Sequence, residues 1–342
     1  MRQREASIKI DDVARSVGYS TATVSRVMNN STLVTEQTRR KVLRAMEDLG
    51  YVPNAAARMM ASHASRTIGA VVPTIENSNY AIGITALQQR LRSAGYTLLI
   101  SFSEYDAELE LEEVKILASR GVDGIMLVGG IHHPDLFKVL ESSGIPYVTT
   151  WVIDRHLPCI GFDNRESGAR IANYLISIGH TDIAVIASLS ETNDRATERV
   201  GGIRTALENN GLSLPDDRII GGLGSIAEGK AAIRTLLSMT EMPTAVIGLN
   251  DSLAFGALLE AQRQGLKVPS DLSIVGFDDL DFAAELTPSL TTVRIPAAEI
   301  GVATAEYLLA QIENKSVSRT VQIPANLIVR DSTAPPRSAT RK

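Results

Sequence analysis

The spacing of apolar residues along the chain changes near residue 67. Before this point apolar side chains recur three and four positions apart, as in amphipathic helices. This spacing predicts helices over Ile10–Val17 and Thr21–Met28, and a third helix that is capped by Thr35 and runs to Leu49. After this point two successive sets of strand-length apolar runs alternate with helical segments, which predicts two lobes with parallel sheets. We therefore expect an α/β chain that begins with a small all-α domain.

The second predicted helix has an unusual outer face. Gly18 is suited to end the first helix in a tight turn, and Ser20 is suited to cap the second. Val24, Val27 and Met28 fall on one side and form a buried stripe. The residues left outside are small, hydroxylated or cationic, and none is acidic: Thr21, Ala22, Ser25 and Arg26. Such a slim face fits a DNA major groove, so the pattern predicts a helix-turn-helix.

Each of these exposed side chains has a plausible DNA contact. Thr21 and Ser25 can bond to phosphates or bases, Ala22 leaves room for a thymine methyl, and Arg26 can fork onto a guanine edge. The alternative is a structural three-helix bundle with a solvated face. The agreement of turn, caps, exposed face and local charge favours DNA binding.

The charge of the chain is divided unevenly. Residues 1–66 hold 11 Lys and Arg against 6 Asp and Glu, a balance of +5, while the remainder holds 23 against 33, a balance of −10. A basic unit on an acidic body is typical of a protein in which one end meets a polyanion. A chance fluctuation of a few charges would look the same, so charge alone leaves both interpretations open.

A family resemblance starts in the same region. "DVARSVGYSTATVSRVMNN", followed by "VTEQTRRKVLRAMEDLGYVPNAAARMMA", closely resembles the start of LacI-family transcription regulators, and the similarity continues to about Asp331. The resemblance implies a homodimer that binds double-stranded operator DNA, and a two-lobed body, like that of periplasmic sugar-binding proteins, that binds a small effector. The DNA-binding residues that we expect are Ser20, Thr21, Ala22, Ser25, Arg26, Asn54, Ala57 and Met60.

A short helix is expected after the first domain. Pro53 interrupts the preceding helical bundle, and Asn54 can cap a helix to about Ala61, which is too short to be stable alone because about 12–15 residues are normally needed. The resemblance implies a hinge helix that folds on DNA and inserts Met60 into the minor groove. The alternative is an alanine-rich linker. The expected domains are 1–52, the hinge 53–66, a first lobe 67–163 with 292–322, and a second lobe 164–291 with 323–335.

The cleft between the two lobes is the expected ligand site, because open α/β sheets bind ligands beyond the carboxyl ends of their strands. The candidate effector-binding residues follow predicted strands of both lobes: Asn79, Tyr80, Trp151, Asn193, Arg195, Arg199, Asn250 and Asp278. The resemblance implies this role for Arg199, Asn250 and Asp278. We expect Asn193, Arg195 and Arg199 to lie on one loop that follows a strand of the second lobe. Taken singly, each residue would more often be a surface polar group, a turn former or a core aromatic.

The candidate residues also suggest the chemistry of the effector. Two arginines, Arg195 and Arg199, against the one carboxylate of Asp278 leave a surplus positive charge, and aromatic rings suit the C–H face of a sugar. We therefore predict a carbohydrate or a sugar acid. A nucleoside that acts as a corepressor is the alternative, although Gly224 provides no ring for stacking on a base.

Motifs for other functions are incomplete. "GSIAEGKA" fits GxxxxGK, but Ala231 follows the lysine where a P-loop needs Ser or Thr. His132 and His133 are adjacent and have no cluster of metal ligands beside them, and no GxSxG elbow occurs. We expect no enzymatic activity, no cofactor and no metal. The alternative is a small-molecule enzyme on the same two-lobed scaffold, for which the sequence offers no assembled catalytic motif. A protein that only binds small molecules would leave the first 66 residues unexplained.

The remaining sequence features concern location. A single cysteine, Cys159, rules out an internal disulfide framework and suits a reducing compartment. The N-terminus has no apolar run like that of a signal peptide, and no apolar stretch is long enough to span a bilayer. We expect a cytoplasmic protein without a membrane partner.

Overall fold

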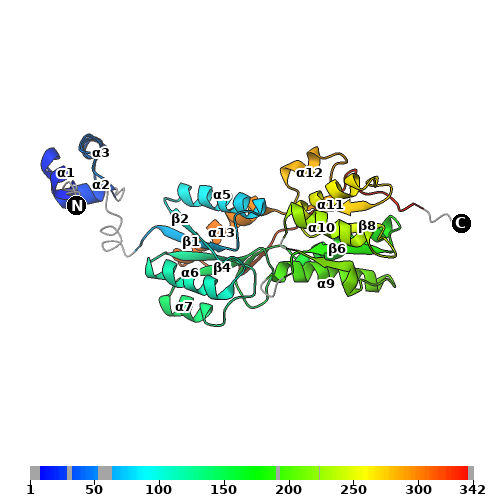
Figure 1. The fold of residues 1–342 in the computed structure, drawn as a ribbon. Helices are drawn as coiled ribbons and strands as arrows, with labels where there is room; N and C mark the ends of the chain where they lie inside the picture. The colour runs from blue at the N-terminus through cyan, green and yellow to red at the C-terminus, as the bar shows by residue number, and fades with distance from the viewer. Residues whose placement is uncertain (1–7, 29–32, 53–63, 190–192, 223, 338–342) are drawn as a thin grey trace, which may run out of the picture. The chain divides into compact units, whose positions relative to one another are not determined.

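The computed structural model describes residues 8–28, 33–52, 64–189, 193–222 and 224–337. They divide into two compact units, Met1–Ser65 and Arg66–Lys342, which are considered separately. Figure 1 labels the elements of both units along the chain.

The first unit is a three-helix bundle, with α1 at Ile10–Val17, α2 at Thr21–Met28 and α3 at Glu36–Asp48. Its core holds the valines that the helical spacing placed inside, including Val24, Val27 and Val42. The predicted bounds of the first two helices are confirmed, and the third ends one residue early because Leu49 is its C-cap.

The turn between α1 and α2 has the predicted chemistry. Gly18 has φ +71°, in the left-handed region where glycine avoids a steric cost, and its N–H donates to the carbonyl of Ala14. The Ser20 hydroxyl accepts the N–H of Thr23 at 3.2 Å, which satisfies one of the unpaired donors at the start of α2. Thr35 caps α3 in the same way, by accepting from Thr38.

The second unit begins with the N-lobe, which is built on a six-stranded parallel sheet in the order β11-β5-β4-β3-β1-β2. Its strands are β1 (Thr67–Val72), β2 (Thr97–Phe102), β3 (Gly124–Val128), β4 (Tyr147–Thr150), β5 (Cys159–Gly161) and β11 (Thr320–Gln322). Its helices are α5 (Ser78–Ser93), α6 (Ala107–Ser119), α7 (Leu136–Ser143) and α13 (Ala297–Ile312). Central strands such as β3 are buried throughout, as expected for a parallel sheet covered on both faces.

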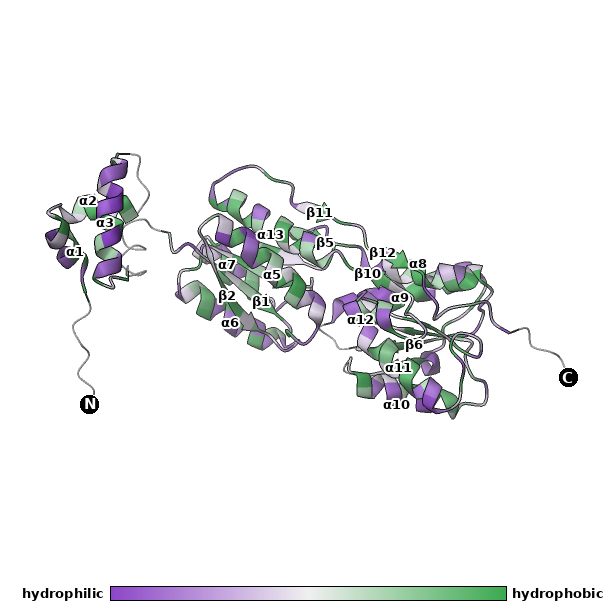
Figure 2. Cartoon of the chain, turned by 90° about the horizontal axis from the view of Figure 1, so that it is seen from above, coloured by the Kyte–Doolittle hydropathy of each residue, from purple (hydrophilic) through white to green (hydrophobic). Residues whose placement is uncertain are grey.

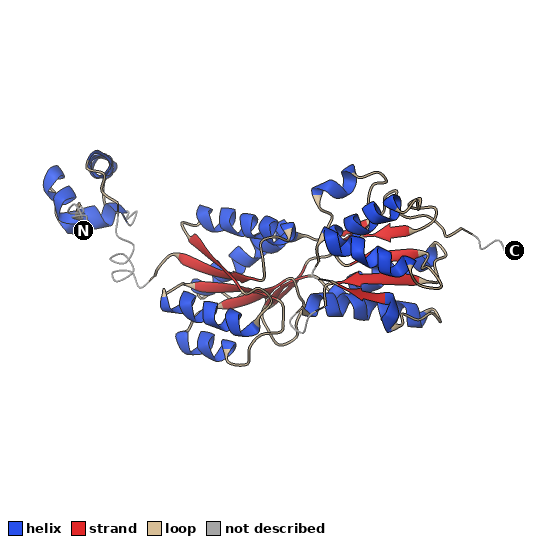
Figure 3. Ribbon diagram, viewed as in Figure 1, coloured by secondary structure: helices blue, strands red, loops and turns tan. Residues whose placement is uncertain are grey.

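The C-lobe repeats this plan on a four-stranded parallel sheet in the order β7-β6-β8-β9. Its strands are β6 (Ile183–Ala187), β7 (Ile219–Gly221), β8 (Ala245–Gly248) and β9 (Ser273–Val275). Its helices are α8 (Asn164–Ser177), α9 (Asp194–Asn209), α10 (Ile226–Leu237), α11 (Asp251–Arg263) and α12 (Asp281–Glu285), with one 3₁₀ turn, η1, at Asp216–Arg218. Figure 3 shows each sheet between helices, and the helices carry hydrophobic and hydrophilic residues on different faces (Figure 2). The predicted α/β body with two lobes and parallel sheets is confirmed.

Three connections join the two lobes. The chain passes from β5 to α8, from β10 (Thr292–Arg294) to α13, and from β11 to β12 (Asn326–Ile328). β10 and β12 pair with each other in an antiparallel ladder, so two of the three connections run side by side. This arrangement brings the carboxyl ends of both sheets toward one space.

One prediction about the C-lobe was wrong. The segment after β6 was expected to be a loop, but α9 occupies Asp194–Asn209, with Asn193 as its N-cap. The first residues of this segment are polar and it contains the Gly201-Gly202 pair, and both features favour a loop. Its apolar residues nevertheless repeat at helical spacing. Gly202 serves helix packing, because a Cβ at this position would collide with the carbonyl of Arg165 on α8. The consequence for the site is that Arg195 and Arg199 lie one turn apart on a helix.

Candidate functional sites

The outer face of α2 is open, as the sequence predicted. Thr21, Ala22 and Arg26 are exposed and Ser25 is half-buried, while the opposite face is buried in the bundle. Within the described residues the guanidinium of Arg26 forms no hydrogen bond or ion pair, so it is available for an outside partner. Ser20 is exposed but its hydroxyl is engaged as the helix cap. The hinge residues Asn54, Ala57 and Met60 lie outside the described residues.

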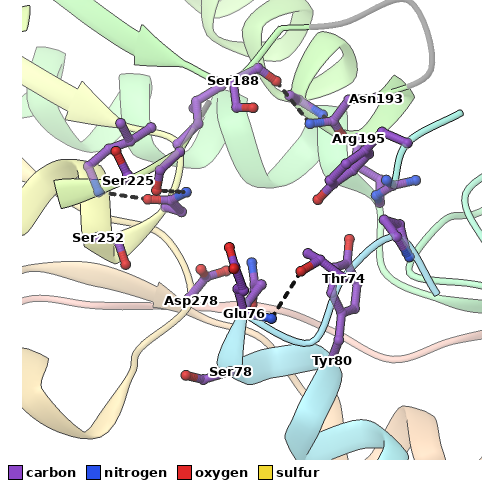
Figure 4. A pocket seen from close by; sticks show the side chains of 18 of the residues that line it. Thr74, Glu76, Ser78, Tyr80, Ser188, Asn193, Arg195, Ser225, Ser252 and Asp278 are labelled. Carbon is purple, nitrogen blue, oxygen red and sulfur yellow. Dashed lines mark hydrogen bonds between the residues drawn. The ribbon is translucent and has the colours of Figure 1, made fainter. Parts of the chain in front are cut away.

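A cavity of about 1020 Å³ lies between the two lobes of the body. Six of the eight predicted effector-binding residues line it: Tyr80, Asn193, Arg195, Arg199, Asn250 and Asp278. Four of them are labelled in Figure 4 and approach the space from different elements, with Tyr80 on α5 of the N-lobe and Asp278 after β9 of the C-lobe. A ligand in this cleft would therefore contact both lobes at once.

Arg199 is fixed at the inner wall of the cleft. Its Nε donates to Asn164 Oδ1 at 2.9 Å and its Nη1 donates to the carbonyl of Leu249 at 3.0 Å. Its guanidinium lies over the ring of Phe277, with Cζ 3.7 Å from the ring centroid. Burial lowers the pKa of Arg199 to about 10, against the opposing effect of Asp278, so the side chain remains a cation at neutral pH. Nη2 has no partner among the described residues and can donate to a ligand.

Asp278 is the buried acid of the cleft and is 4% exposed. Its backbone has φ +130° and donates its N–H to the carbonyl of Val293 at 2.8 Å, which ties it to the connecting strand β10. Burial and then the neighbouring carboxylate of Asp251 raise the pKa of Asp278 well above its ordinary value, while Arg199 and the amides of Asn79 and Asn77 oppose the shift. The side chain therefore holds its proton more tightly than an ordinary aspartic acid.

Asp251 supports Asp278 from behind. It is fully buried, and its two oxygens accept the hydroxyl of Thr292 at 2.6 Å and the N–H of Leu280 at 2.8 Å. Burial raises its pKa to about 6 although both of these bonds oppose the shift. One oxygen holds the loop after β9 through Leu280, and the other holds the start of β10, the strand to which the backbone of Asp278 is bonded. Asp251 is therefore a positioning residue for Asp278.

Asn193 and Asn250 have the same local geometry. Each caps a helix with Oδ1, accepting from Ala196 at 3.4 Å and from Leu253 at 2.7 Å. Each also donates Nδ2 to a neighbouring loop carbonyl, that of Ser188 for Asn193 at 2.9 Å and that of Gly224 for Asn250 at 3.1 Å. They hold loops at the cleft, and one N–H and one lone pair of each amide have no partner within the part of the chain that the structure describes.

The positive charge of Arg195 is balanced by an ion pair that the sequence analysis did not include. Its Nη1 is paired with Asp194 Oδ1 at 2.7 Å, and the other oxygen of Asp194 accepts the N–H of Gly130 from the N-lobe at 2.6 Å. Three further acids line the cleft: Glu76, Glu104 and Glu228. The argument from surplus positive charge was therefore wrong.

The structure and the sequence of the chain are similar to those of known proteins. A model of bacterial regulatory proteins of the lacI family matches residues 9–54, and a model of a periplasmic binding protein-like domain matches residues 172–333. The regulator DegA of Bacillus subtilis is 33% identical over 335 residues, 95% of this chain and 98% of its own. The repressor PurR of Vibrio campbellii is 33% identical over 94% of this chain and 98% of its own.

The chain belongs to the LacI family. Among solved structures, the Lac repressor dimer bound to operator and the anti-inducer ONPF is similar with a TM-score of 0.87 and 26% identity, covering 96% of this chain and 99% of its own. A complex of the regulator CelR with cellobiose has a TM-score of 0.69 and 28% identity, covering 95% and 99%. This LacI-family chain is thus a DNA-binding transcriptional regulator.

Two predicted residues of the regulator do not line the cleft. Trp151 is only 2% exposed, and its ring lies against Gly83 and meets Tyr80 edge-on with centroids 5.2 Å apart. It turns inward because Gly83 leaves room between α5 and the sheet. Asn79 is 3% exposed, and its Nδ2 lies near enough to Asp278 to lower the pKa of that carboxyl without forming a geometrically acceptable hydrogen bond among the described residues. Trp151 supports Tyr80 from behind and does not offer a face to a ligand in this structure.

The regulator's cleft also contains residues that were missed. They are mostly aromatic or polar side chains near strand ends and helix starts: Asn77, Phe102, Tyr105, Ser225 and Phe282. Phe102 and Tyr105 come at and just after the end of a strand that the sequence predicted, so the rule that selected Tyr80 could have found them. Phe282 lies on α12, which has only five residues and gives no periodic signal.

The histidine pair considered as a possible metal site has a structural role instead. His132 is buried, with Nδ1 2.8 Å from Glu110 and Nε2 3.0 Å from the carbonyl of Gly129. No group of three or more His, Cys, Asp or Glu that could hold a metal is found in the described part of the chain. The search of the same residues for a helix long and apolar enough to cross a membrane finds none.

Proposed function

We propose that this LacI-family regulator represses transcription as a homodimer on a palindromic operator, and that a carbohydrate in the cleft changes its operator affinity. The observation that carries the proposal is that Tyr80 of the N-lobe and Arg199 and Asp278 of the C-lobe line one cavity. A ligand that fits one arrangement of the lobes better than another shifts the population toward it. Operator and effector affinities are then coupled reciprocally. The likeness to a Lac repressor dimer bound to operator supports the homodimer and the DNA partner.

The lining of the cleft supports a neutral carbohydrate. Arg199 Nη2, Asp278 and the two capping asparagines offer directional hydrogen bonds, while Tyr80 and Tyr105 supply apolar faces. The pairing of Arg195 with Asp194 removes the reason to prefer a sugar acid. The similar structure of CelR with cellobiose agrees with this class, and a nucleoside corepressor is the second candidate.

We further propose that the body binds its ligand without converting it, and that the protein acts in the cytoplasm, where operator DNA lies. The relatives are transcriptional regulators, which supports binding without turnover. We propose that binding of the effector releases the operator.

A selection of bound sequences from a random DNA library tests the regulator role. We expect the full chain to enrich an inverted repeat of two half-sites. A thermal-shift screen of sugars, sugar acids and nucleosides then tests the effector class, because a ligand that binds the folded state raises its melting temperature. Enrichment of no inverted repeat would contradict the operator proposal. Stabilisation by nucleosides alone would replace the carbohydrate by the second candidate.

A further inference from the structure

The outer part of the cleft is lined by apolar side chains that stay exposed among the described residues. Ile75 is 50% exposed, Phe102 is 41% exposed and Ile226 is 37% exposed, and all three line the cavity. Phe282 of α12 joins them and is half-buried. We call Ile75, Phe102, Ile226 and Phe282 the apolar rim. Ile75 and Phe102 belong to the N-lobe, whereas Ile226 and Phe282 belong to the C-lobe.

The inner part of the cleft is different in chemistry. Arg199 and Asp278 are 8% and 4% exposed, and they present polar atoms to the cavity. The cleft is thus graded, from a buried polar end to an exposed apolar rim. A ligand that filled it would carry hydrogen-bonding groups at one end and apolar faces at the other.

The rim stays exposed in this structure although the lobes touch elsewhere. The lobes already meet in this structure, because the N–H of Gly130 in the N-lobe donates to Asp194 in the C-lobe at 2.6 Å. With this contact made, the cavity still holds about 1020 Å³ and the rim side chains remain exposed. This volume lies at the upper end of the roughly 300–1,000 Å³ that is usual for drug-sized ligands, so it favours a ligand of more than one ring.

Acidic side chains limit what can lie at the outer end. Glu76 and Glu104 are exposed on the N-lobe wall, and Glu228 of α10 lines the C-lobe wall. An anionic extension such as a phosphate or carboxylate would meet repulsion there. A neutral ring with an apolar face would instead cover Phe102 and Phe282, and it would bring no charged group of its own that must lose water.

Resting on the function proposed above, we infer that the effector is a neutral, extended carbohydrate: a first sugar ring at the polar end and a second ring, sugar or aryl, against the apolar rim. Hydrogen bonds between the first ring and the side chains of Arg199 and Asp278 orient the ligand in the cleft. The second ring gains affinity from apolar contact with Phe102 and Phe282, and this contact distinguishes the ligand from a free monosaccharide.

The test compares ligands in matched pairs on the full chain. Glucose, galactose, mannose and xylose are each paired with a disaccharide and with a phenyl β-glycoside that contain the same first ring, and binding is measured by calorimetry. We expect at least one two-ring compound to bind tenfold or more tightly than its monosaccharide, a ratio that burial of an aromatic face can supply. A monosaccharide that binds as tightly as its two-ring partners would overturn the inference.

Variants of the rim locate the second ring. Phe102→Ser and Phe282→Ser should remove most of the difference between the two-ring compound and its monosaccharide, and leave monosaccharide binding unchanged. Ile116→Ser, which alters an exposed apolar residue of α6 outside the cleft, is the matched control. An advantage for two rings that survives both rim variants would overturn the placement. Binding of no compound in the panel would overturn both this inference and the carbohydrate effector, whereas operator selection tests the regulator role independently.

Discussion

The guanidinium of Arg199 lies against the ring of Phe277, with Cζ 3.7 Å from the ring centroid, while Nε and Nη1 are held by Asn164 and Leu249. The stacking and the two donated bonds fix the plane of the guanidinium. The remaining Nη2 is thereby oriented before any ligand arrives, so little entropy is lost when it binds. Asn164 in turn donates to the carbonyl of Trp151 at 2.9 Å, which links this arginine to the N-lobe.

Arg199→Lys should therefore be harmful although it keeps the charge. A lysine cannot stack as a plane or donate to both Asn164 and Leu249, so at least one buried acceptor loses its partner. We expect the free energy of unfolding of the body to fall by about 1–3 kcal/mol, and effector affinity to fall as well. Chemical denaturation and calorimetry measure the two effects.

Arg204→Lys is the control for this variant, since Arg204 lies on the same helix and pairs with the exposed Asp216 at 2.9 Å. It should change stability by less than about 0.5 kcal/mol. Equal effects of the two substitutions would show that the environment of Arg199 has no special role.

The pH dependence of stability should reflect a buried pair of carboxyls with raised pKa values, Asp278 and Asp251. The contribution of Asp251 can be derived by itself. Its pKa is about 6 in the folded protein, above the value of about 3.9 for an exposed aspartate. Between these values the folded state binds more protons than the unfolded state. The free energy of unfolding therefore falls as pH rises from about 4 through 6, by up to about 3 kcal/mol from this group.

Asp251→Asn should flatten this dependence. The asparagine can accept from the N–H of Leu280 with its oxygen, and the hydroxyl of Thr292 can reverse to accept from its amide, so both contacts survive. Denaturation at pH 4.5, 6 and 8 compares wild type and variant. A slope that is the same in both proteins would show that another group controls it.

The sequence predicted some parts of this structure to the residue and missed others, for physical reasons. α1 and α2 were predicted to the residue because a glycine, a capping serine and a valine stripe all indicated the same bounds. Trp151 was placed at the correct strand end, but a strand end does not determine which way a side chain turns, and the space beside Gly83 took the ring inward. The net charge of the cleft was misjudged because the sequence does not show that Asp194 forms an ion pair with its neighbour Arg195. The other oxygen of Asp194 accepts the N–H of Gly130, which holds the carboxylate in place.

Arg26→Ala should weaken operator binding by about 1–3 kcal/mol and relax base preference at one position in each half-site. The reason is the exposure of Arg26 on α2, without a partner among the described residues. Arg15→Ala, on the exposed face of α1, is the matched control, and we expect it to leave base preference unchanged. Fluorescence anisotropy on the selected operator, on single-base variants and on random DNA measures the effect. Equal losses on specific and random DNA would assign Arg26 to phosphate contact.

Asp278→Asn should separate effector binding from folding and from DNA binding. The carboxyl of Asp278 faces the cavity, and burial beside Asp251 raises its pKa, so a neutral amide relieves like-charge repulsion. Asparagine also tolerates the positive φ of this position better than most residues. We expect stability at neutral pH to be retained or raised, operator affinity to persist, and effector binding to weaken at least tenfold, because the amide nitrogen can only donate at a place where a carboxylate oxygen accepts from ligand hydroxyls. Thermal unfolding, operator titration and effector calorimetry on one preparation give the three readouts. A variant that melts well below wild type and loses operator binding as well would make Asp278 a structural residue of the loop after β9, and unchanged effector affinity would remove it from the effector site.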